Sequence, residues 1–237
     1  MAGNYLFSRE IKINDRIRIL IPTVGEVMDN EEEYYNLVSL LTAMPIDLMV
    51  GLDDIGIDYT EIDEYQLFLM IFEQIKNSDT SLIFGDLDLK GFRLAKNNST
   101  NMYIEYDQKN DITIDMAIHD QIATALRTIH HLEKNRRKPA NGEAKRYMLE
   151  RARKKMKRKA KEPYRSQLEP LIVSLVNTAE FKYDYEGTRD MTIYQFNESV
   201  LQIIRKINWD NRMIGVYIGT VNAKELRKDD LTWVRTA

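Results

Sequence analysis

The sequence feature that most constrains this chain is the uneven distribution of its charges. Residues 127–165 carry 16 Lys and Arg against 4 Asp and Glu, whereas residues 1–126 carry 9 against 23. Residues 166–237 carry 9 against 10, so the net charge of −3 for the whole chain conceals strong polarity. Unpaired charges are costly to bury. The basic segment must therefore lie at the surface, in solvent or against acidic groups of this chain or of a partner.

The bulk properties exclude several classes of protein. At 237 residues, the chain is long enough for one large domain or two modest ones. It has no cysteine, which excludes disulfides, zinc–thiolate sites and cysteine nucleophiles. The N-terminus lacks the pattern of a signal peptide. The longest apolar stretch, residues 35–52, is interrupted by Pro45 and Asp47. We therefore expect it to be a core segment and expect no membrane span.

The first 76 residues predict a strand pair followed by two helices. Apolar and polar side chains alternate from residue 11 to 21, which is typical of a strand or hairpin, and residues 22–25 are expected to end it. Asn30 is expected to cap a helix, because three glutamates follow where the helix dipole favours them. Asp63 and Gln66 form a capping box that predicts a second helix. The expected buried positions are Tyr34, Leu37, Val38 and Leu41, then Leu67, Phe68, Ile71, Phe72 and Ile75.

Residues 81–114 predict a small antiparallel meander. Four short runs, at residues 81–84, 92–95, 102–106 and 112–114, have strand character. Turn residues separate them, at Gly85, at Gly91, at residues 97–101 and at Lys109-Asn110.

From Asp115 onward the pattern is helical. Apolar residues recur at spacings of four and three between Ile118 and Leu132, which indicates a packing seam of the coiled-coil type. Pro139 and Asn141-Gly142 end this helix, and residues 143–161 form a basic helix with a thin apolar stripe. Two further capping boxes predict two more helices: Ser166 with Glu169, and Thr192 with Gln195. In residues 209–233 we expect a short helix, a glycine-bounded segment at 215–219 and a final turn near Asn222.

The predicted fold class is α+β, with short antiparallel strands and two helices in the N-terminal region and a mostly helical C-terminal half. We expect three regions: an acidic α+β region at residues 1–115, a helical arm with the basic helix at 116–162, and a C-terminal helical domain at 163–237.

Candidate catalytic and metal sites are weak. His119 and His130 are 11 residues apart on one predicted helix, about 16 Å along its axis, which is too far to share one ion. Asp115 with His119, or His130 with Glu133, supplies two ligands where three or four are usual. The pairs Asp53-Asp54 and Asp86-x-Asp88 sit in no wider metal-binding pattern and are typical of turns. No phosphate loop, nucleophile elbow or HExxH motif is present. We expect no enzyme activity, metal or cofactor.

The basic helix is the strongest candidate for a binding site. Three interpretations remain open: it binds nucleic acid by neutralising phosphates, it pairs with the acidic N-terminal region of its own chain, or it binds an acidic protein partner. Aromatic residues, which would support nucleic-acid binding, are few in the segment. The predicted partner-binding residues are Arg146, Arg151, Arg153, Lys154, Lys155, Lys157, Arg158 and Lys159.

Three blocks of sequence resemble proteins encoded in the structural-gene clusters of tailed phages of Gram-positive bacteria. The first is ILIPTVGEV at residues 19–27 with EYY at 33–35, and the second is QLEPLI at 167–172 with FKYDY at 181–185. The third is IYQFNESV at 193–200 with GVYIG at 215–219. These are packing and turn motifs, so they carry no catalytic residue with them.

The resemblance implies a non-enzymatic, chaperone-like factor for tail assembly. Its expected partner is a helical or acidic phage structural protein, such as the tape-measure or baseplate-hub protein. The surfaces expected to bind it are the basic helix, at residues 146–161, and the apolar seam, at residues 118–132. The alternatives are a stoichiometric component of the virion tail or baseplate and a nucleic-acid-binding factor. We expect the protein in the bacterial host cytoplasm or in the virion tail, without membrane contact. The resemblance leaves open whether the chain forms homo-oligomers.

Overall fold

The computed structural model describes residues 4–97 and 100–234, and it confirms the α+β class with a mostly helical second half. An N-terminal hairpin, β1 (Glu10–Lys12) and β2 (Arg18–Leu20), pairs Ile11 with Ile19, as the alternating pattern predicts. Its turn is set by Asn14, whose side chain accepts hydrogen bonds from the backbone N–H groups of Arg16 and Ile17 at 2.8 and 2.7 Å. The helices of the first half are α1 (Val24–Asp29), α2 (Glu31–Leu41), α3 (Met49–Asp54), α4 (Glu64–Lys76) and α5 (Ser81–Phe84), with a 3-10 turn at Pro45–Leu48.

A three-stranded antiparallel meander follows, in the order β3 (Arg93–Lys96), β4 (Tyr103–Asp107) and β5 (Ile112–Ile114). These strands confirm three of the four predicted runs. The fourth prediction was wrong: residues 81–84 form the one-turn helix α5. A run of four residues is too short for its periodicity to separate strand from helix. The Asp79 carboxylate accepts a hydrogen bond from the backbone N–H of Ser81 at 3.0 Å and so starts the turn. Of the predicted turn at 97–101, residues 98 and 99 lie outside the described ranges.

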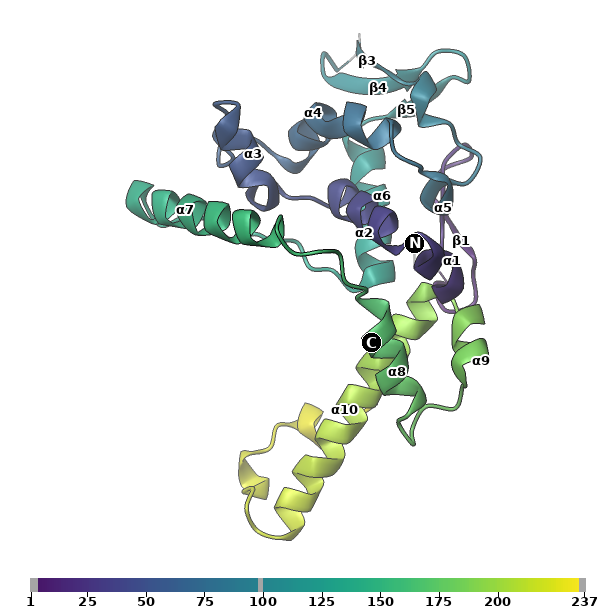
Figure 1. Ribbon diagram of the computed structural model, residues 1–237, viewed down its shortest axis with the longest axis vertical. Helices are drawn as coiled ribbons and strands as arrows, with labels where there is room; N and C mark the ends of the chain where they lie inside the picture. Colours follow the sequence, from purple (N-terminus) through teal and green to yellow (C-terminus); the bar gives the residue numbers. More distant parts are fainter. Residues whose placement is uncertain (1–3, 98–99, 235–237) are drawn as a thin grey trace.

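The long helix α6 (Met116–His130) lies at the centre of the molecule, and α2, α4, β2, β5 and the later helix α10 pack around it (Figure 1). The helix begins where the helical pattern was predicted to begin, and Asp115 caps it by accepting a hydrogen bond from the Ile118 N–H at 2.9 Å. Ile122, Ala125 and Ile129 of the predicted seam are buried in the main hydrophobic cluster. This seam is therefore occupied by the chain's own core, and the expectation that it forms a partner-binding surface was wrong.

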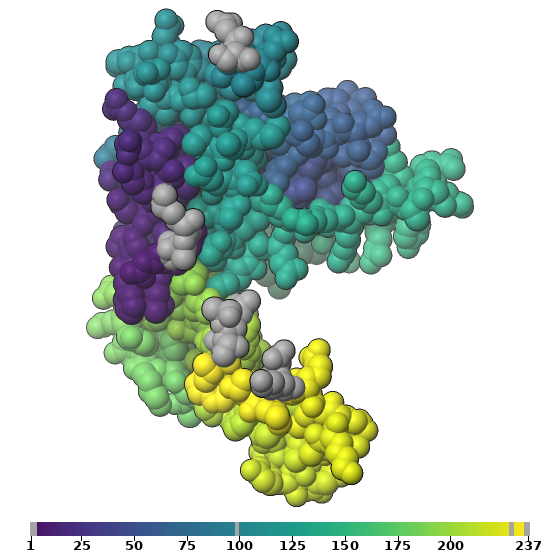
Figure 2. All heavy atoms as spheres, turned by 180° about the vertical axis from the view of Figure 1, so that it is seen from behind, coloured from purple at the N-terminus to yellow at the C-terminus, as the bar shows by residue number. Residues whose placement is uncertain are grey.

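The second half contains the basic helix α7 (Gly142–Lys159), α8 (Leu168–Val176), α9 (Tyr185–Asp190) and α10 (Ile193–Tyr217). Two short 3-10 turns, Ala223–Glu225 and Lys228–Leu231, lie in the returning tail. Figure 2 shows from behind that α7 and the second half of α10 with this tail both extend away from the body of the molecule.

Two further predictions need correction. Residues 22–25, expected only to end the hairpin, start helix α1 with a capping box in which Thr23 and Glu26 bond each other's backbone N–H. The expected break at residues 215–219 comes too early, because α10 continues through Gly215 to Tyr217. Gly215 makes room for the returning chain: a Cβ there would lie 2.7 Å from a methyl carbon of Val221.

The core does not follow the three predicted regions. The main hydrophobic cluster contains Ile19 and Val24 from the first region, Ile129 from the second, and Leu168 and Phe196 from the third. The division at residues 115 and 162 stays a prediction, but all three regions contribute to one core.

Candidate partner-binding site on the basic helix

Helix α7 begins with a strong local start signal. The Asn141 side chain accepts a hydrogen bond from the backbone N–H of Ala144 at 2.8 Å, and Glu143 lies in the first turn. Lys157, Arg158 and Lys159 lie in the last turn, where the helix dipole favours positive charge. The helix can therefore form although it has few apolar residues.

One face of α7 docks on a lobe built around α3. Leu149 is the single buried side chain of the helix, and it belongs to a second hydrophobic cluster, separate from the main core. The residues that surround it come from residues 43–67, between the end of α2 and the first turns of α4. This cluster comprises Ala43, Ile46, Leu52, Tyr59, Leu67 and Leu149.

Two cations of α7 pair with the acidic side of that lobe. Lys145 forms an ion pair with Asp58, and its hydrogen bond lowers the pKa of Asp58 to about 2. The Lys145 ammonium also lies 5.5 Å from the centre of the Tyr59 ring. Arg153 bridges Asp53 and Asp54, each at 2.6 Å. Pairing with the acidic N-terminal region is therefore real, and among the residues that the structure describes it uses these two cations of α7.

The remaining predicted residues are exposed to solvent. Of the eight, Arg153 is engaged with Asp53 and Asp54, and the other seven are exposed and form no ion pair within residues 4–97 and 100–234. Figure 1 shows that the start of α7 forms the far tip of the extended helix, whereas its last turn leads back towards α8. These seven residues are Arg146, Arg151, Lys154, Lys155, Lys157, Arg158 and Lys159.

Helix α7 also carries exposed apolar groups that the charge pattern alone did not highlight. Met156 is seven residues after Leu149, so it lies on the same helix face, but it is 60% exposed. Tyr147 is exposed on the helix as well. Met156 was visible in the sequence as part of the thin stripe. That it would stay exposed while Leu149 is buried was not visible there.

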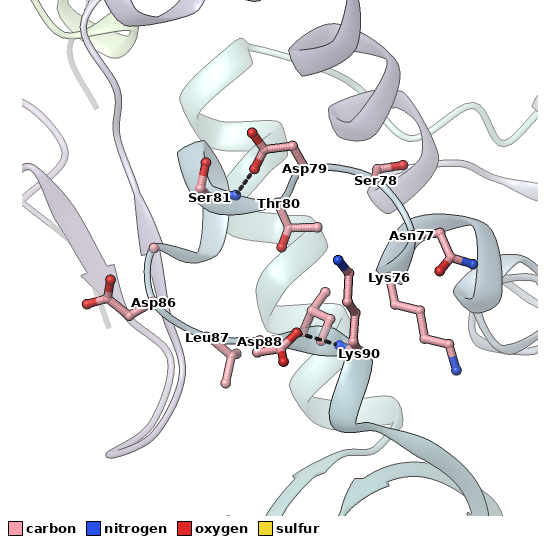
Figure 3. A pocket seen from close by; sticks show the side chains of 12 residues that line it. Lys76, Asn77, Ser78, Asp79, Thr80, Ser81, Asp86, Leu87, Asp88 and Lys90 are labelled. Atoms are coloured by element: carbon pink, nitrogen blue, oxygen red, sulfur yellow. Dashed lines mark hydrogen bonds between the residues drawn. The ribbon is translucent and has the colours of Figure 1, made fainter.

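The acidic pairs predicted as weak metal-site candidates do not form a binding site. Figure 3 shows Asp86 pointing away from Asp88, although both line one cavity of about 380 Å³. Asp88 accepts a hydrogen bond from the backbone N–H of Lys90 at 2.9 Å and thereby starts a 3-10 turn. The Asp53-Asp54 pair is held by Arg153. Both pairs therefore have the turn and pairing roles expected of surface acids.

The two histidines predicted to be weak metal-ligand candidates are packing residues, His119 buried and His130 half-buried. Burial lowers the pKa of His119 to about 4 and that of His130 to about 3, so both are neutral at pH 7. The His119 ring lies 4.3 Å from the Phe68 ring, and His130 shares a 2.9 Å hydrogen bond with the Tyr34 hydroxyl. Within the described ranges, no three His, Asp or Glu side chains are grouped so that they could hold one metal ion.

A cavity of about 590 Å³ lies between the start of α4, the start of α6 and the meander. Its acidic residues are already engaged. Asp63 and Asp115 cap the two helices, whereas Glu64 pairs with Arg127 at 2.5 Å and Asp120 with Lys134 at 2.9 Å. These acidic side chains therefore stabilise the fold by capping and ion pairing, and α7 remains the candidate site.

A comparison with protein families finds one match, in the second half of the chain. The model of a family described as the YomV second domain matches residues 156–236, and YomV is a name associated with phages and prophages. The matched segment begins inside α7 and includes α8, α9 and α10. No curated protein and no solved structure matches the chain. None of the helices in the described part of the chain has the length and apolar character needed to span a membrane.

Proposed function

We propose that this chain is a non-enzymatic phage factor that acts in tail morphogenesis by binding another tail protein, of the tape-measure or baseplate-hub type. The seven exposed cations of α7 carry this proposal, because the fold holds the helix in place and leaves them without ion pairs in the described residues. The similarity of residues 156–236 to a phage-associated domain supports the biological setting.

A protein partner fits this surface better than nucleic acid does. Proteins that bind single-stranded nucleic acid without sequence preference combine basic residues with aromatic side chains on which bases stack. Helix α7 offers one exposed aromatic residue, Tyr147, and it offers the apolar Met156 in line with its docked stripe. An exposed apolar side chain flanked by cations suits an amphipathic helix with acidic flanks. Long-range attraction between these cations and an acidic partner would also speed up their association.

Nucleic acid remains the second candidate, favoured by the number of free cations on one helix. If α7 binds duplex DNA through its free cations, the logarithm of the binding constant falls with the logarithm of salt by about 0.9 for each phosphate neutralised. A titration at several salt concentrations, with duplex and single-stranded probes, measures this slope. A flat salt dependence, or no binding, removes this candidate.

The proposal is tested by a tagged pull-down from phage-producing cells, with nuclease treatment and identification of the bound proteins by mass spectrometry. The test variant replaces Arg151, Lys154, Lys155 and Arg158 by Glu. The control replaces four exposed cations of the N-terminal half, Arg16, Lys90, Lys96 and Lys109, by Glu, so both variants change the net charge equally.

We expect the wild type and the control to retain a tail protein and the α7 variant to lose it. Equal capture by both variants, or recovery of nucleic acid alone, would overturn the proposal. Mass spectrometry of purified virions separates the two assembly roles: a chaperone is absent from the finished particle, whereas a stoichiometric tail component is present in it.

A further inference from the structure

Packing explains only part of the environment of His119, the buried histidine of α6. It is 3% exposed, and the centre of its ring lies 4.3 Å from that of Phe68 and 5.8 Å from that of Tyr65. This packing uses the apolar character of the ring, but neither ring nitrogen has a hydrogen-bond partner within residues 4–97 and 100–234. A buried polar group without a partner in its own chain requires an explanation, and a ligand is one.

This histidine lines the cavity of about 590 Å³ between the start of α4, the start of α6 and the meander. Its ring nitrogens are not fully enclosed by protein atoms, so the small exposed part of the residue includes them and a ligand in the cavity can reach them. The volume lies within the range of about 300–1,000 Å³ that is usual for sites of small organic molecules. None of the described residues that line the cavity belongs to α7, so the site is separate from the basic helix.

Apolar and aromatic side chains form one part of the lining. Tyr65 and Ile104 are buried there, whereas Tyr103 and Met116 are exposed. The Tyr65 hydroxyl bonds the backbone carbonyls of Tyr103 and Ile114 at 3.1 and 3.0 Å, and it thereby attaches α4 to β4 and β5. Figure 1 shows α4 and the first turns of α6 beneath this meander. The wall is therefore part of the fold, and it suits a ligand with an apolar body.

The charged part of the lining is acidic. Its carboxylates are those of Asp63, Glu64, Asp115 and Asp120, and no Lys or Arg is among the described residues that line the cavity. Lys134 lies 3.1 Å from Glu64 and 2.9 Å from Asp120. Asp63 and Asp115 each use one carboxylate oxygen to cap a helix, and in the described part of the chain neither forms an ion pair. The cavity thus retains negative charge, which favours a cation over an anion.

We propose that this cavity binds a small protonated organic amine, whose ammonium group donates a hydrogen bond to the imidazole of His119 and whose apolar body packs against Tyr103 and Met116. The lowered pKa of His119 keeps its ring neutral at pH 7, and a neutral imidazole has one nitrogen that accepts a hydrogen bond. An ammonium group has donors only, so it matches this acceptor. The faces of the aromatic rings also attract a cation.

The first test titrates the full-length protein at pH 7 with three probes of similar shape and different charge. Phenethylamine is a cation at this pH, phenethyl alcohol is neutral and phenylacetate is an anion. The NMR signals of the three histidine rings report binding, and the spectrum of His119→Phe assigns one of them. We expect phenethylamine to shift the His119 signals saturably and to bind about tenfold tighter than the alcohol, because its hydrogen bond carries a charge. Phenylacetate should not bind.

The second test measures the affinity of phenethylamine for three variants. His119→Phe keeps an aromatic ring but removes the acceptor, so we expect about tenfold weaker binding. Asp115→Asn removes a negative charge and retains a good helix cap, and we expect about threefold weaker binding. The matched control is Asp184→Asn, which changes the cap of α9, where Asp184 accepts the Gly187 N–H at 2.8 Å away from the cavity. This control should bind like the wild type.

Circular dichroism checks that each variant is folded. The proposal would be overturned by the absence of a saturable shift of the His119 signals with phenethylamine, by equally tight binding of the alcohol or of phenylacetate, or by unchanged affinity in folded His119→Phe. If His119→Phe does not fold, the two aspartate variants decide, and equal affinity in Asp115→Asn and Asp184→Asn would then overturn it.

Discussion

Glu31 is a carboxylate whose burial is explained by the backbone groups that it binds. It accepts hydrogen bonds from the N–H groups of Gln167 and Leu168 at 2.6 and 2.9 Å, at the start of α8. The first turn of α2 thus caps a helix more than a hundred residues further along the chain. We expect Glu31→Ala to lower the free energy of unfolding by about 2 kcal/mol, because it removes a charged cap. Urea denaturation at pH 7 measures the change.

The neighbouring Glu32 supplies the matched control, since it is exposed in the same helical turn and its replacement removes the same charge. Burial acts to raise the pKa of Glu31, but hydrogen bonds from Ser166 and the α8 backbone outweigh it and hold the pKa below its usual 4.5. The stabilisation is therefore present above pH 4.5 and is lost as the pH falls through the lowered value. An effect of Glu32→Ala as large as that of Glu31→Ala would contradict this interpretation.

Glu105 on β4 has the opposite pH dependence. It is 4% exposed, its Oε2 atom has no hydrogen-bond partner among the described residues, and burial raises its pKa to about 7. Between pH 4.5 and 7 the native state holds a proton that the unfolded state has released, so stability falls as the pH rises through this window. We expect Glu105→Gln to stabilise the protein by about 2 kcal/mol at pH 8 and far less at pH 5. Thermal unfolding at both pH values measures the difference, and an equal effect at each would contradict it.

At the residue scale, the sequence predicts those contacts that are local. Asp63 and Thr192 cap their helices as expected, because each contact spans only three residues. Asn30 does not use its side chain, since α1 runs directly into α2 and the Asn30 N–H already bonds the carbonyl of Val27 at 3.1 Å. The role of Glu31 depends on a partner 136 residues away, which no local pattern can indicate.

At the scale of elements, the attachment of α7 depends on one buried side chain and two cations. We expect Leu149→Ala to weaken this attachment by about 2 kcal/mol, because it removes the apolar contact with the second cluster. Hydrogen exchange across residues 142–159 should then become faster by local opening, while α6 exchanges as before. The control is Met156→Ala, on the same helix face but 60% exposed, which should change neither. Faster exchange throughout the chain would mean that α7 supports the whole fold.

The same scale shows why some elements could be predicted and others could not. The basic helix was predictable, because its cap, its charges and its terminal proline are all local signals. Its docking was only partly predictable: Lys145 and Leu149 share a face at a spacing of four, but the sequence does not indicate that Asp58 and the second cluster lie opposite them. The length of α10 depends on the returning tail at Gly215, so the glycine that suggested a break is instead a packing position.

At the scale of the whole molecule, the N-terminal region and the segment similar to the YomV second domain meet through backbone contacts. The starts of α1 and α10 form an antiparallel bridge between Thr23 and Thr192. The Val24 N–H bonds the carbonyl of Met191 and the Ile193 N–H bonds that of Pro22, each at 2.8 Å. The same capping threonines thus start two helices and join the two halves of the chain.

This junction predicts that the two halves unfold together. Ile193 and Phe196 are fully buried, and they belong to the same cluster as Ile21 and Val24 of the first half. A fragment of residues 156–237 would expose this apolar surface to water, since the groups that cover it lie in the missing half. We expect full-length protein to show one cooperative transition by calorimetry and the isolated fragment to show none.

Mixing the fragments 1–155 and 156–237 provides the control, because it restores every residue without restoring the covalent link. Cooperative unfolding should return in the mixture if the shared core is what stabilises both halves. A fragment 156–237 that unfolds cooperatively by itself would contradict the prediction, and it would mean that the α8–α10 segment is an independent domain that only docks on the N-terminal half.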